Sequence, residues 1–87
     1  MTKQYKYMCD AGHGWMSVKR VECIDHGIID KISHYSYQNG ASVYLEEDCD
    51  MSLFFNTYNA KFGTDPSLKT THTDKRSPIR SYASFKI

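Results

Sequence analysis

The chain has 87 residues, of which 40% are hydrophobic and 24% charged, and its formal net charge is +1. This composition is typical of a folded protein, and the length predicts a single domain over residues 1–87 with one modest core. A core of that size excludes a deep, enclosed active site. The near-zero net charge argues against a mimic of DNA and against a protein that seeks nucleic acid strongly.

The sequence indicates neither a membrane span nor secretion. No apolar run approaches the roughly 20 residues that a membrane helix needs, and the N-terminal stretch MTKQYKYMCD contains no apolar segment. The chain has three cysteines, an odd number without the spacing of a disulfide framework. We therefore expect reduced thiols and a cytoplasmic location.

Two strands and a short helix are predicted near the N-terminus. Residues 4–9 and residues 15–19 alternate between two sets of side chains, and the glycine-containing turn between them favours an antiparallel pair. Residues 20–26 are predicted to form a helix that ends at Gly27. Its expected buried side chains are Val21 and Ile24 or Cys23.

A β-hairpin is predicted around Asn39-Gly40, because this pair supplies the two positive φ angles of a type I′ turn. Such a turn pairs Tyr37 with Ser42 and Tyr35 with Tyr44. Since side chains alternate across a strand, one face of the hairpin then carries tyrosines and the other is more aliphatic. The tyrosine face consists of Tyr35, Tyr37, Ser42 and Tyr44, and the other face of Ile32, His34, Ser36, Val43 and Leu45.

The clearest helical pattern covers residues 50–62, where apolar side chains follow the spacing of one helical stripe. Asp50 or Asp48 is placed to cap the first N–H groups, and Gly63 is placed to end the helix in a left-handed conformation. The stripe should cover the aliphatic face of the hairpin and bury Leu45. It consists of Met51, Phe54, Phe55, Tyr58 and Phe62.

After this helix, residues 68–73 predict an edge strand, and residues 79–87 alternate as a strand up to the C-terminus. The sequence therefore predicts an α+β fold. We expect a small, mostly antiparallel sheet of four to six strands with two helices on one face, the longer at about residues 50–62.

The tyrosine face and the acids that follow it form the main candidate binding surface. Tyrosines combine contact area, low rotamer entropy and a polar tip, so they are favoured at interfaces. Acids at the start of a helix complement its dipole and also offer a charged docking patch. The alternative is that Tyr5 and Tyr7, or the C-terminal strand, cover the tyrosine face as core; what remains exposed is a candidate homodimer surface. The candidate partner-binding residues are Tyr35, Tyr37, Tyr44, Glu46, Glu47 and Asp48.

Two groups of side chains have metal-binding character. Cys9, His13, Cys23 and His26 could close a tetrahedral zinc site, but their spacing matches no standard zinc finger. The acids Glu46, Glu47, Asp48 and Asp50 could bind a divalent cation, but they lack the glycine-containing loop of a calcium hand and suit a helix start. The sequence predicts no metal and no cofactor.

Two alternatives use other residues. Residues 65–87 carry five bases and two acids, so this segment could follow a phosphate backbone and stack a base, although the excess is small for a nucleic-acid domain and also fits a solvated edge strand. His13, exposed in a glycine-rich turn beside Trp15, could serve a small enzyme or a nucleotide-binding protein, or could simply cap the turn. The candidate nucleic-acid-binding residues are Lys75, Arg76, Arg80 and Tyr82.

Four strings of the sequence resemble small proteins encoded by bacteriophages and other mobile elements: GHGW at 12–15, ISHYSYQNG at 32–40, VYLEEDCD at 43–50 and SPIRSY at 77–82. Cys23 departs from the aliphatic residue expected there, which counts against a zinc site that uses it. The resemblance assigns no activity and implies a bacterial host cytoplasm. Together with the absence of a catalytic constellation, it predicts a small non-enzymatic binding protein that docks on a host protein and modulates or inhibits a host system.

Overall fold

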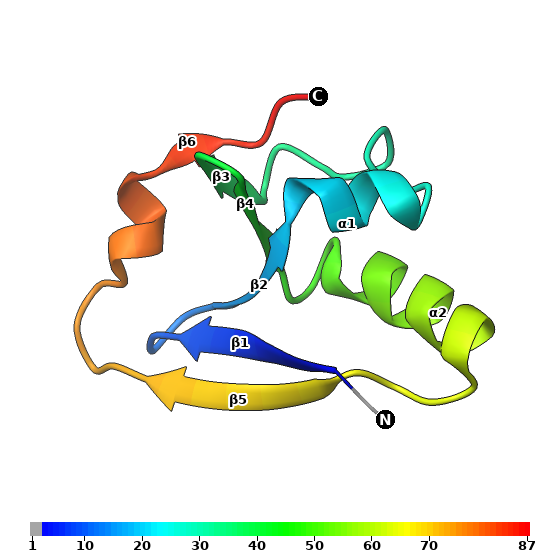
Figure 1. Ribbon diagram of the computed structural model, residues 1–87. Helices are drawn as coiled ribbons and strands as arrows, with labels where there is room; N and C mark the ends of the chain where they lie inside the picture. Colours follow the sequence, from blue (N-terminus) through cyan, green and yellow to red (C-terminus); the bar gives the residue numbers. More distant parts are fainter. Residues whose placement is uncertain (1–2) are drawn as a thin grey trace.

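The computed structural model describes residues 3–87 as a six-stranded sheet in the order β5-β1-β2-β4-β3-β6, with both helices on one face (Figure 1). The predicted α+β fold with a mostly antiparallel sheet is confirmed. The strands are β1 (Gln4–Cys9), β2 (Gly14–Lys19), β3 (Tyr37–Asn39), β4 (Ser42–Glu46), β5 (Ser67–His72) and β6 (Ala83–Ser84). The helices are α1 (Arg20–Asp25) and α2 (Met51–Phe62), and a 3-10 helix, η1, spans Pro78–Ser81.

The sheet places the C-terminal half of the chain at both of its edges. β5 pairs with β1 in parallel along its whole length, from Gln4–Ser67 to Cys9–His72, while the other pairs are antiparallel. The edge strand predicted over residues 68–73 is thus confirmed. The parallel direction follows from topology, because α2 and the segment after it carry the chain back to the end at which β1 begins (Figure 1).

The hairpin forms, but its predicted register is wrong. Tyr37 pairs with Tyr44 and Asn39 with Ser42, so the connecting residues are Gly40 and Ala41. Only Gly40 in this turn has a positive φ, of 60°, whereas a type I′ turn needs a positive φ at Asn39 as well. The shift leaves Tyr35 outside β3, in a turn at which it is 60% exposed.

Helix α2 confirms the clearest helical prediction. Phe54 and Tyr58 are buried over Val43 and Leu45, both of which are fully buried, so the stripe covers the aliphatic face as expected. Gly63 ends the helix with a φ of 74°, and its N–H donates to the carbonyl of Asn59. The last residue of the stripe is not buried, since Phe62 is 56% exposed.

The short helix α1 buries Cys23 and leaves Val21 and Ile24 more than half exposed. Of the three residues that the sequence analysis considered for burial in this helix, only Cys23 is buried. Burial raises the pKa of the Cys23 thiol to about 12, which keeps it protonated as a small apolar side chain in the core.

The C-terminal strand predicted over residues 79–87 is wrong. Pro78 starts η1, where the Ser77 hydroxyl accepts a hydrogen bond from the N–H of Ile79, and only Ala83–Ser84 pairs with β3. The apparent alternation arises because Ile79 and Phe85 are both buried although they lie in different elements. Pro78 also lacks an N–H to donate to a strand ladder. Neither helix within residues 3–87 has the length and apolar character needed to cross a bilayer.

Candidate functional site

Asp10, buried at the end of β1, holds the turn that follows this strand against the C-terminal segment. Its carboxylate accepts hydrogen bonds from the N–H groups of Gly12, His13 and Ser77 at 3.0–3.1 Å, and from the guanidinium of Arg80 at 2.6 and 2.9 Å. The Arg80 guanidinium and these N–H groups hold the pKa of Asp10 well below its usual range. Arg80 was predicted as a nucleic-acid contact, but its charge is neutralised by Asp10.

Glu46, the last residue of β4, is buried and does not project from the helix start as predicted. One carboxylate oxygen accepts from the N–H groups of Asp48 and Cys49 at 3.0 and 2.9 Å. The other lies 3.3 Å from Nδ1 of His13. This acid therefore organises the turn between β4 and α2, while Asp48 is exposed at the surface of that turn.

Asp50 occupies the position before α2, but its side chain makes no capping hydrogen bond to the helix. Its carboxylate instead accepts from the N–H of Ser33 at 3.0 Å, from the Ser33 hydroxyl at 2.6 Å and from the Ser36 hydroxyl. The predicted capping role is wrong for this reason. Asp50 fixes the loop that carries Tyr35, which lies between the two serines.

Glu46 lines one open cavity of about 260 Å³, which lies where β2 begins and β4 ends. Asp10 and Asp50 do not line it, but they hold Arg80 and the loop of Tyr35, which do. Four of the six predicted partner-binding residues contribute to its wall: Tyr35, Tyr37, Glu46 and Asp48. They are joined by His13, Trp15, Cys49 and Arg80. The cavity brings together residues from four segments of the chain.

Aromatic rings line this cavity, and one of them already contacts a cation. Trp15 is 2% exposed, Tyr37 meets it edge-on at 6.1 Å between ring centroids, and the Arg80 guanidinium lies 5.2 Å from its ring. Trp15 Nε1 is the single buried side-chain polar atom without a hydrogen-bond partner within residues 3–87. Sequence reasoning noted Trp15 only as a neighbour of His13, and nothing in the sequence linked it to Arg80, far along the chain.

The two other predicted partner-binding residues lie outside the cavity. Tyr44 packs against Tyr82 with ring centroids 5.2 Å apart, so the C-terminal segment partly covers the tyrosine face. Glu47 accepts a hydrogen bond from the Tyr7 hydroxyl. Burial and this hydrogen bond raise the pKa of Tyr7 above its usual range, so it stays protonated.

The four residues of the possible zinc site do not come together. Cys9 lies against His72, with Sγ and Nδ1 3.4 Å apart, while Cys23 is in the core. His26 contacts the ring of Phe54 at 4.4 Å between centroids. The group within residues 3–87 that could hold a metal is instead His13, Glu46, Glu47 and Asp48, whose ligand atoms all lie within 4.8 Å of one another.

This His13 group does not make a convincing metal centre. The carboxylate of Glu46 already accepts two backbone N–H groups, and that of Glu47 accepts the Tyr7 hydroxyl. The cavity is also a poor site for thiol chemistry, because the hydrogen bond with Glu46 raises the pKa of the Cys49 thiol and so lowers its thiolate fraction.

The basic C-terminal residues do not form one surface strand. Arg76 donates to the Ser81 hydroxyl and to the carbonyl of Arg80, both at 3.4 Å, and Lys75 is exposed in the loop before η1. Tyr82 is half-buried against Tyr44. Of the predicted nucleic-acid-binding residues, Lys75, Arg76 and Arg80 line one open cavity of about 280 Å³ together with Asp10 and Asp74, whereas Tyr82 lies outside it.

Comparisons with protein-family models, with curated proteins and with solved structures found no match. The fold and the cavity define a small α+β protein with an aromatic, acidic surface site. Its function has to be argued from that geometry.

Proposed function

We propose that this chain is a non-enzymatic binding protein whose cavity receives a basic side chain, lysine or arginine, of a partner protein. The observation that carries the proposal is the assembly of Tyr35, Tyr37, Glu46 and Asp48 around one cavity with Trp15 at its base. Aromatic faces beside carboxylates are the surroundings in which proteins bind organic cations.

The charge of the cavity favours a cation. Glu46 and Asp48 contribute two negative charges, and the positive charge of Arg80 is balanced by Asp10. Glu47 adds a further acid next to the rim. Arginine in a partner is favoured over neutral groups, because it combines this electrostatic attraction with stacking on tyrosine.

The exposed position of Tyr35 supports a role in docking. It is 60% exposed and rests on His34, with ring centroids 4.4 Å apart. An aromatic side chain that is largely open to solvent, on a loop held by the buried Asp50, is available to a partner without rearrangement of the core. The held loop also lowers the entropy lost on binding.

The setting of this interaction is part of the proposal. The resemblance of four sequence strings to phage-encoded proteins motivates a host protein of the bacterial cytoplasm as the partner, and modulation or inhibition of a host system as the outcome. That origin remains a prediction. The binding chemistry of the cavity does not depend on it.

The test compares two double variants for capture of a partner from bacterial lysate. Tyr35→Ala with Asp48→Ala changes the cavity, and Phe62→Ala with Asp30→Ala makes the same kinds of change at exposed positions elsewhere. We expect the captured protein to be lost only by the first variant. Since Trp15 is the single tryptophan, its fluorescence then gives the affinity of the purified partner.

A partner retained equally by both variants would remove the cavity from the proposal. Replacement of the contacting arginine or lysine of the partner by glutamine should weaken binding more than tenfold. Sedimentation of the purified protein shows whether the partner is a second copy of this chain or a different protein, because only a homodimer forms in the absence of lysate.

A further inference from the structure

Three lysines on the sheet face opposite the helices have no ion-pair partner. Lys6 lies in β1, Lys19 in β2 and Lys69 in β5, and all three are exposed. The alternation of these strands places them on the face away from the core, because their neighbours Tyr5, Val18 and Leu68 point into or against it. The ion pairs found within residues 3–87 involve other bases.

Two of these lysines are direct neighbours. Lys6 and Lys69 are partners in the parallel register of β1 and β5. Neighbouring strands lie about 4.8 Å apart, and like charges placed opposite one another destabilise a sheet. An anion bound over the pair removes this repulsion, so the arrangement indicates a negatively charged ligand.

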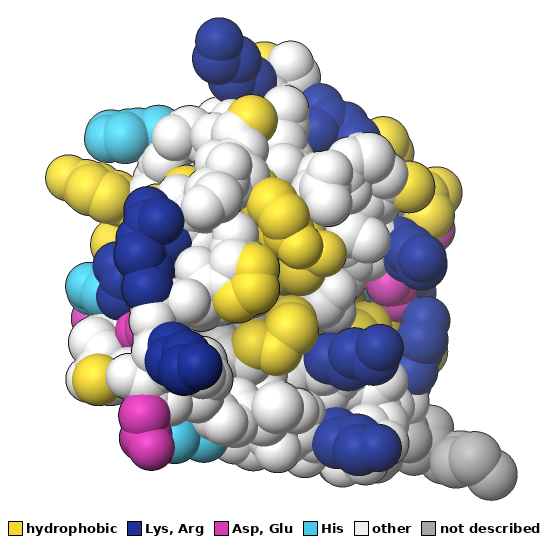
Figure 2. All heavy atoms as spheres, turned by 90° about the vertical axis from the view of Figure 1, so that its left-hand side faces the viewer, with side chains coloured by type: hydrophobic (Ala, Val, Ile, Leu, Met, Phe, Trp, Pro, Cys, Tyr) yellow, Lys and Arg dark blue, Asp and Glu magenta, His cyan; other side chains and the backbone are white. Residues whose placement is uncertain are grey.

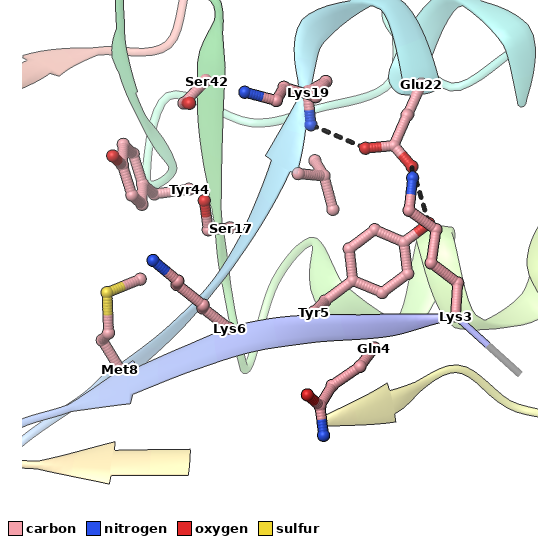
Figure 3. Close-up of a pocket in the computed structure, with 11 residues that line it drawn as sticks. Lys3, Gln4, Tyr5, Lys6, Met8, Ser17, Lys19, Glu22, Ser42 and Tyr44 are labelled. Carbon is pink, nitrogen blue, oxygen red and sulfur yellow. Dashed lines mark hydrogen bonds and ion pairs between the residues drawn. The ribbon is translucent and has the colours of Figure 1, made fainter. Parts of the chain in front are cut away.

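A groove opens beside Lys6, where β1 and β2 separate. Their ladder contains only the pairs from Tyr7–Met16 to Cys9–Gly14, and the strands diverge before Lys6 can pair with Ser17. The resulting cavity has a volume of about 400 Å³. In Figure 3 the side chains of Lys6 and Lys19 extend toward the part of the groove that carries Ser17, Ser42 and Tyr44.

The acid at the edge of this groove does not neutralise the free lysines. Glu22 accepts hydrogen bonds from Lys3 Nζ at 2.9 Å, from the Tyr5 hydroxyl at 2.6 Å and from the N–H of Lys19 at 2.9 Å. Its carboxylate is thus engaged on the helix side of the groove (Figure 3). The ammonium groups of Lys6 and Lys19 and the hydroxyls beside them remain as donors for an anion.

Aromatic side chains adjoin these donors. Tyr44 and Tyr82 pack together at 5.2 Å on the same face, and both are half-buried. Figure 2, seen from the left-hand side of Figure 1, shows lysine and arginine side chains on either side of a central group of hydrophobic side chains. Lysines around aromatic rings on an open sheet face are the arrangement by which proteins hold a phosphate backbone and stack its bases.

We propose that this face binds single-stranded nucleic acid. One phosphate lies in the groove between Lys6 and Lys19, a neighbouring phosphate lies over Lys6 and Lys69, and an unpaired base stacks on the exposed part of Tyr44. A single strand is favoured over a duplex, because the bases of a duplex are already stacked and paired and cannot reach a flat sheet face. This lysine groove lies at the opposite end of β2 from the cavity proposed for a partner protein, so the two sites are separate.

The test measures fluorescence polarisation of labelled 12-nucleotide oligo(dT) and oligo(U) at two salt concentrations. Release of counterions from these two phosphates predicts that binding weakens about sevenfold between 50 and 200 mM salt. Lys6→Ala with Lys69→Ala should weaken binding at 50 mM salt more than tenfold and flatten the salt dependence. Tyr44→Leu, which keeps an apolar side chain at this half-buried position but removes the ring, should weaken it about tenfold through lost stacking.

Lys75→Ala with Arg76→Ala is the matched control, because it removes two exposed positive charges outside the groove. We expect this control to change the affinity for the oligonucleotides less than twofold. The unfolding curves of both double variants should match the wild type or show slightly greater stability. Absence of binding at 50 mM salt, equal loss in the control variant, or tighter binding to a duplex of the same length would each overturn the proposal. Comparison of the affinities for oligo(dT) and oligo(U) shows whether the site prefers DNA or RNA.

Discussion

The charged side chains at the two ends of the open sheet face differ in whether they are buried and hydrogen-bonded or exposed and unpaired. At one end, Trp15 of β2 pairs with Glu46 of β4, and at the other, Lys19 pairs with Ser42. The buried acids Asp10, Glu46 and Asp50 all lie at the first end, where each accepts at least two hydrogen bonds. At the second end, Lys6, Lys19 and Lys69 have no ion pair within residues 3–87, and Lys6 and Lys19 line the gap between β1 and β2.

This difference shows that the charge of a residue says little about its availability to a ligand. A buried carboxylate that accepts turn N–H groups stabilises the fold, because removal of it leaves those donors unsatisfied. An exposed ammonium group without a partner contributes little to the fold and is free for binding. Substitutions at the cavity end should therefore cost stability, and those at the groove end should change binding.

Asp10→Asn should have the largest effect on stability, because Asp10 accepts five hydrogen bonds, two of them from Arg80. The Arg80 guanidinium lowers the pKa of Asp10 in the folded state. A lowered pKa contributes stability above the unfolded-state value of about 4 that is lost as the pH falls toward the folded-state value. Urea unfolding should show a large deficit at pH 7 that shrinks below about pH 4.

Asp74→Asn is the control for this comparison, since the Asp74 side chain is fully exposed. Its unfolding curve should follow the wild type at each pH. A deficit in Asp10→Asn that stays constant down to pH 2 would contradict a role for the Asp10 charge.

Asp50→Ala should lower the free energy of unfolding by about 3 kcal/mol, because Ser33 and Ser36 lose a buried charged acceptor. A simple helix cap would cost only about 1 kcal/mol, so urea denaturation separates the two roles. Asp48→Ala, two residues away and exposed, should change stability by less than about 0.5 kcal/mol. A loss near 1 kcal/mol in Asp50→Ala would favour the capping role that the sequence predicted.

Gly14→Ala should cost about 2 kcal/mol, because a methyl group at this position overlaps with the hydroxyl and ring of Tyr7. Tyr7 would have to leave its hydrogen bond to Glu47. In a Tyr7→Ala background the same change should cost much less, which a double-mutant cycle measures. If Gly14→Ala lowers the free energy of unfolding equally in the wild type and in Tyr7→Ala, the packing of Tyr7 does not require a glycine at position 14.

Glu46→Ala and Glu47→Ala separate two neighbouring acids that the sequence treated alike. Glu46 is 6% exposed and accepts two backbone N–H groups, so its loss should cost about 1–2 kcal/mol. Glu47 is exposed, and its replacement should cost no more than about 0.5 kcal/mol. Thermal unfolding measures both, and a cost for Glu47→Ala as large as that for Glu46→Ala would contradict the difference between them.

Lys69→Glu should have the smallest effect on stability and the opposite sign. It replaces the repulsion with Lys6 by an attraction across β1 and β5, which should stabilise the sheet by about 0.5 kcal/mol. The same change should abolish binding of oligo(dT) or oligo(U). If the variant is more stable and still binds the oligonucleotides, the Lys6–Lys69 pair is not part of the nucleic-acid site.

The sequence by itself determined the elements whose signals are local. The α+β class, β1, the extent of α2 and its end at Gly63 follow from side-chain periodicity and one left-handed glycine, which need no distant contact. It also indicated that Tyr35, Tyr37, Glu46 and Asp48 could serve binding, because exposed tyrosines and acids beside a helix start are a local pattern.

Only the tertiary structure decided which charges are free. Asp10 meets Arg80 across 70 positions of sequence, and Lys6 meets Lys69 because β5 joins β1 in parallel. The hairpin register differs from the predicted one because Asn39 has no positive φ and pairs with Ser42, so that Tyr35 lies outside the strand, at the cavity rim. Local patterns carry no information on such pairings, since they depend on how strands distant in sequence come to share one sheet.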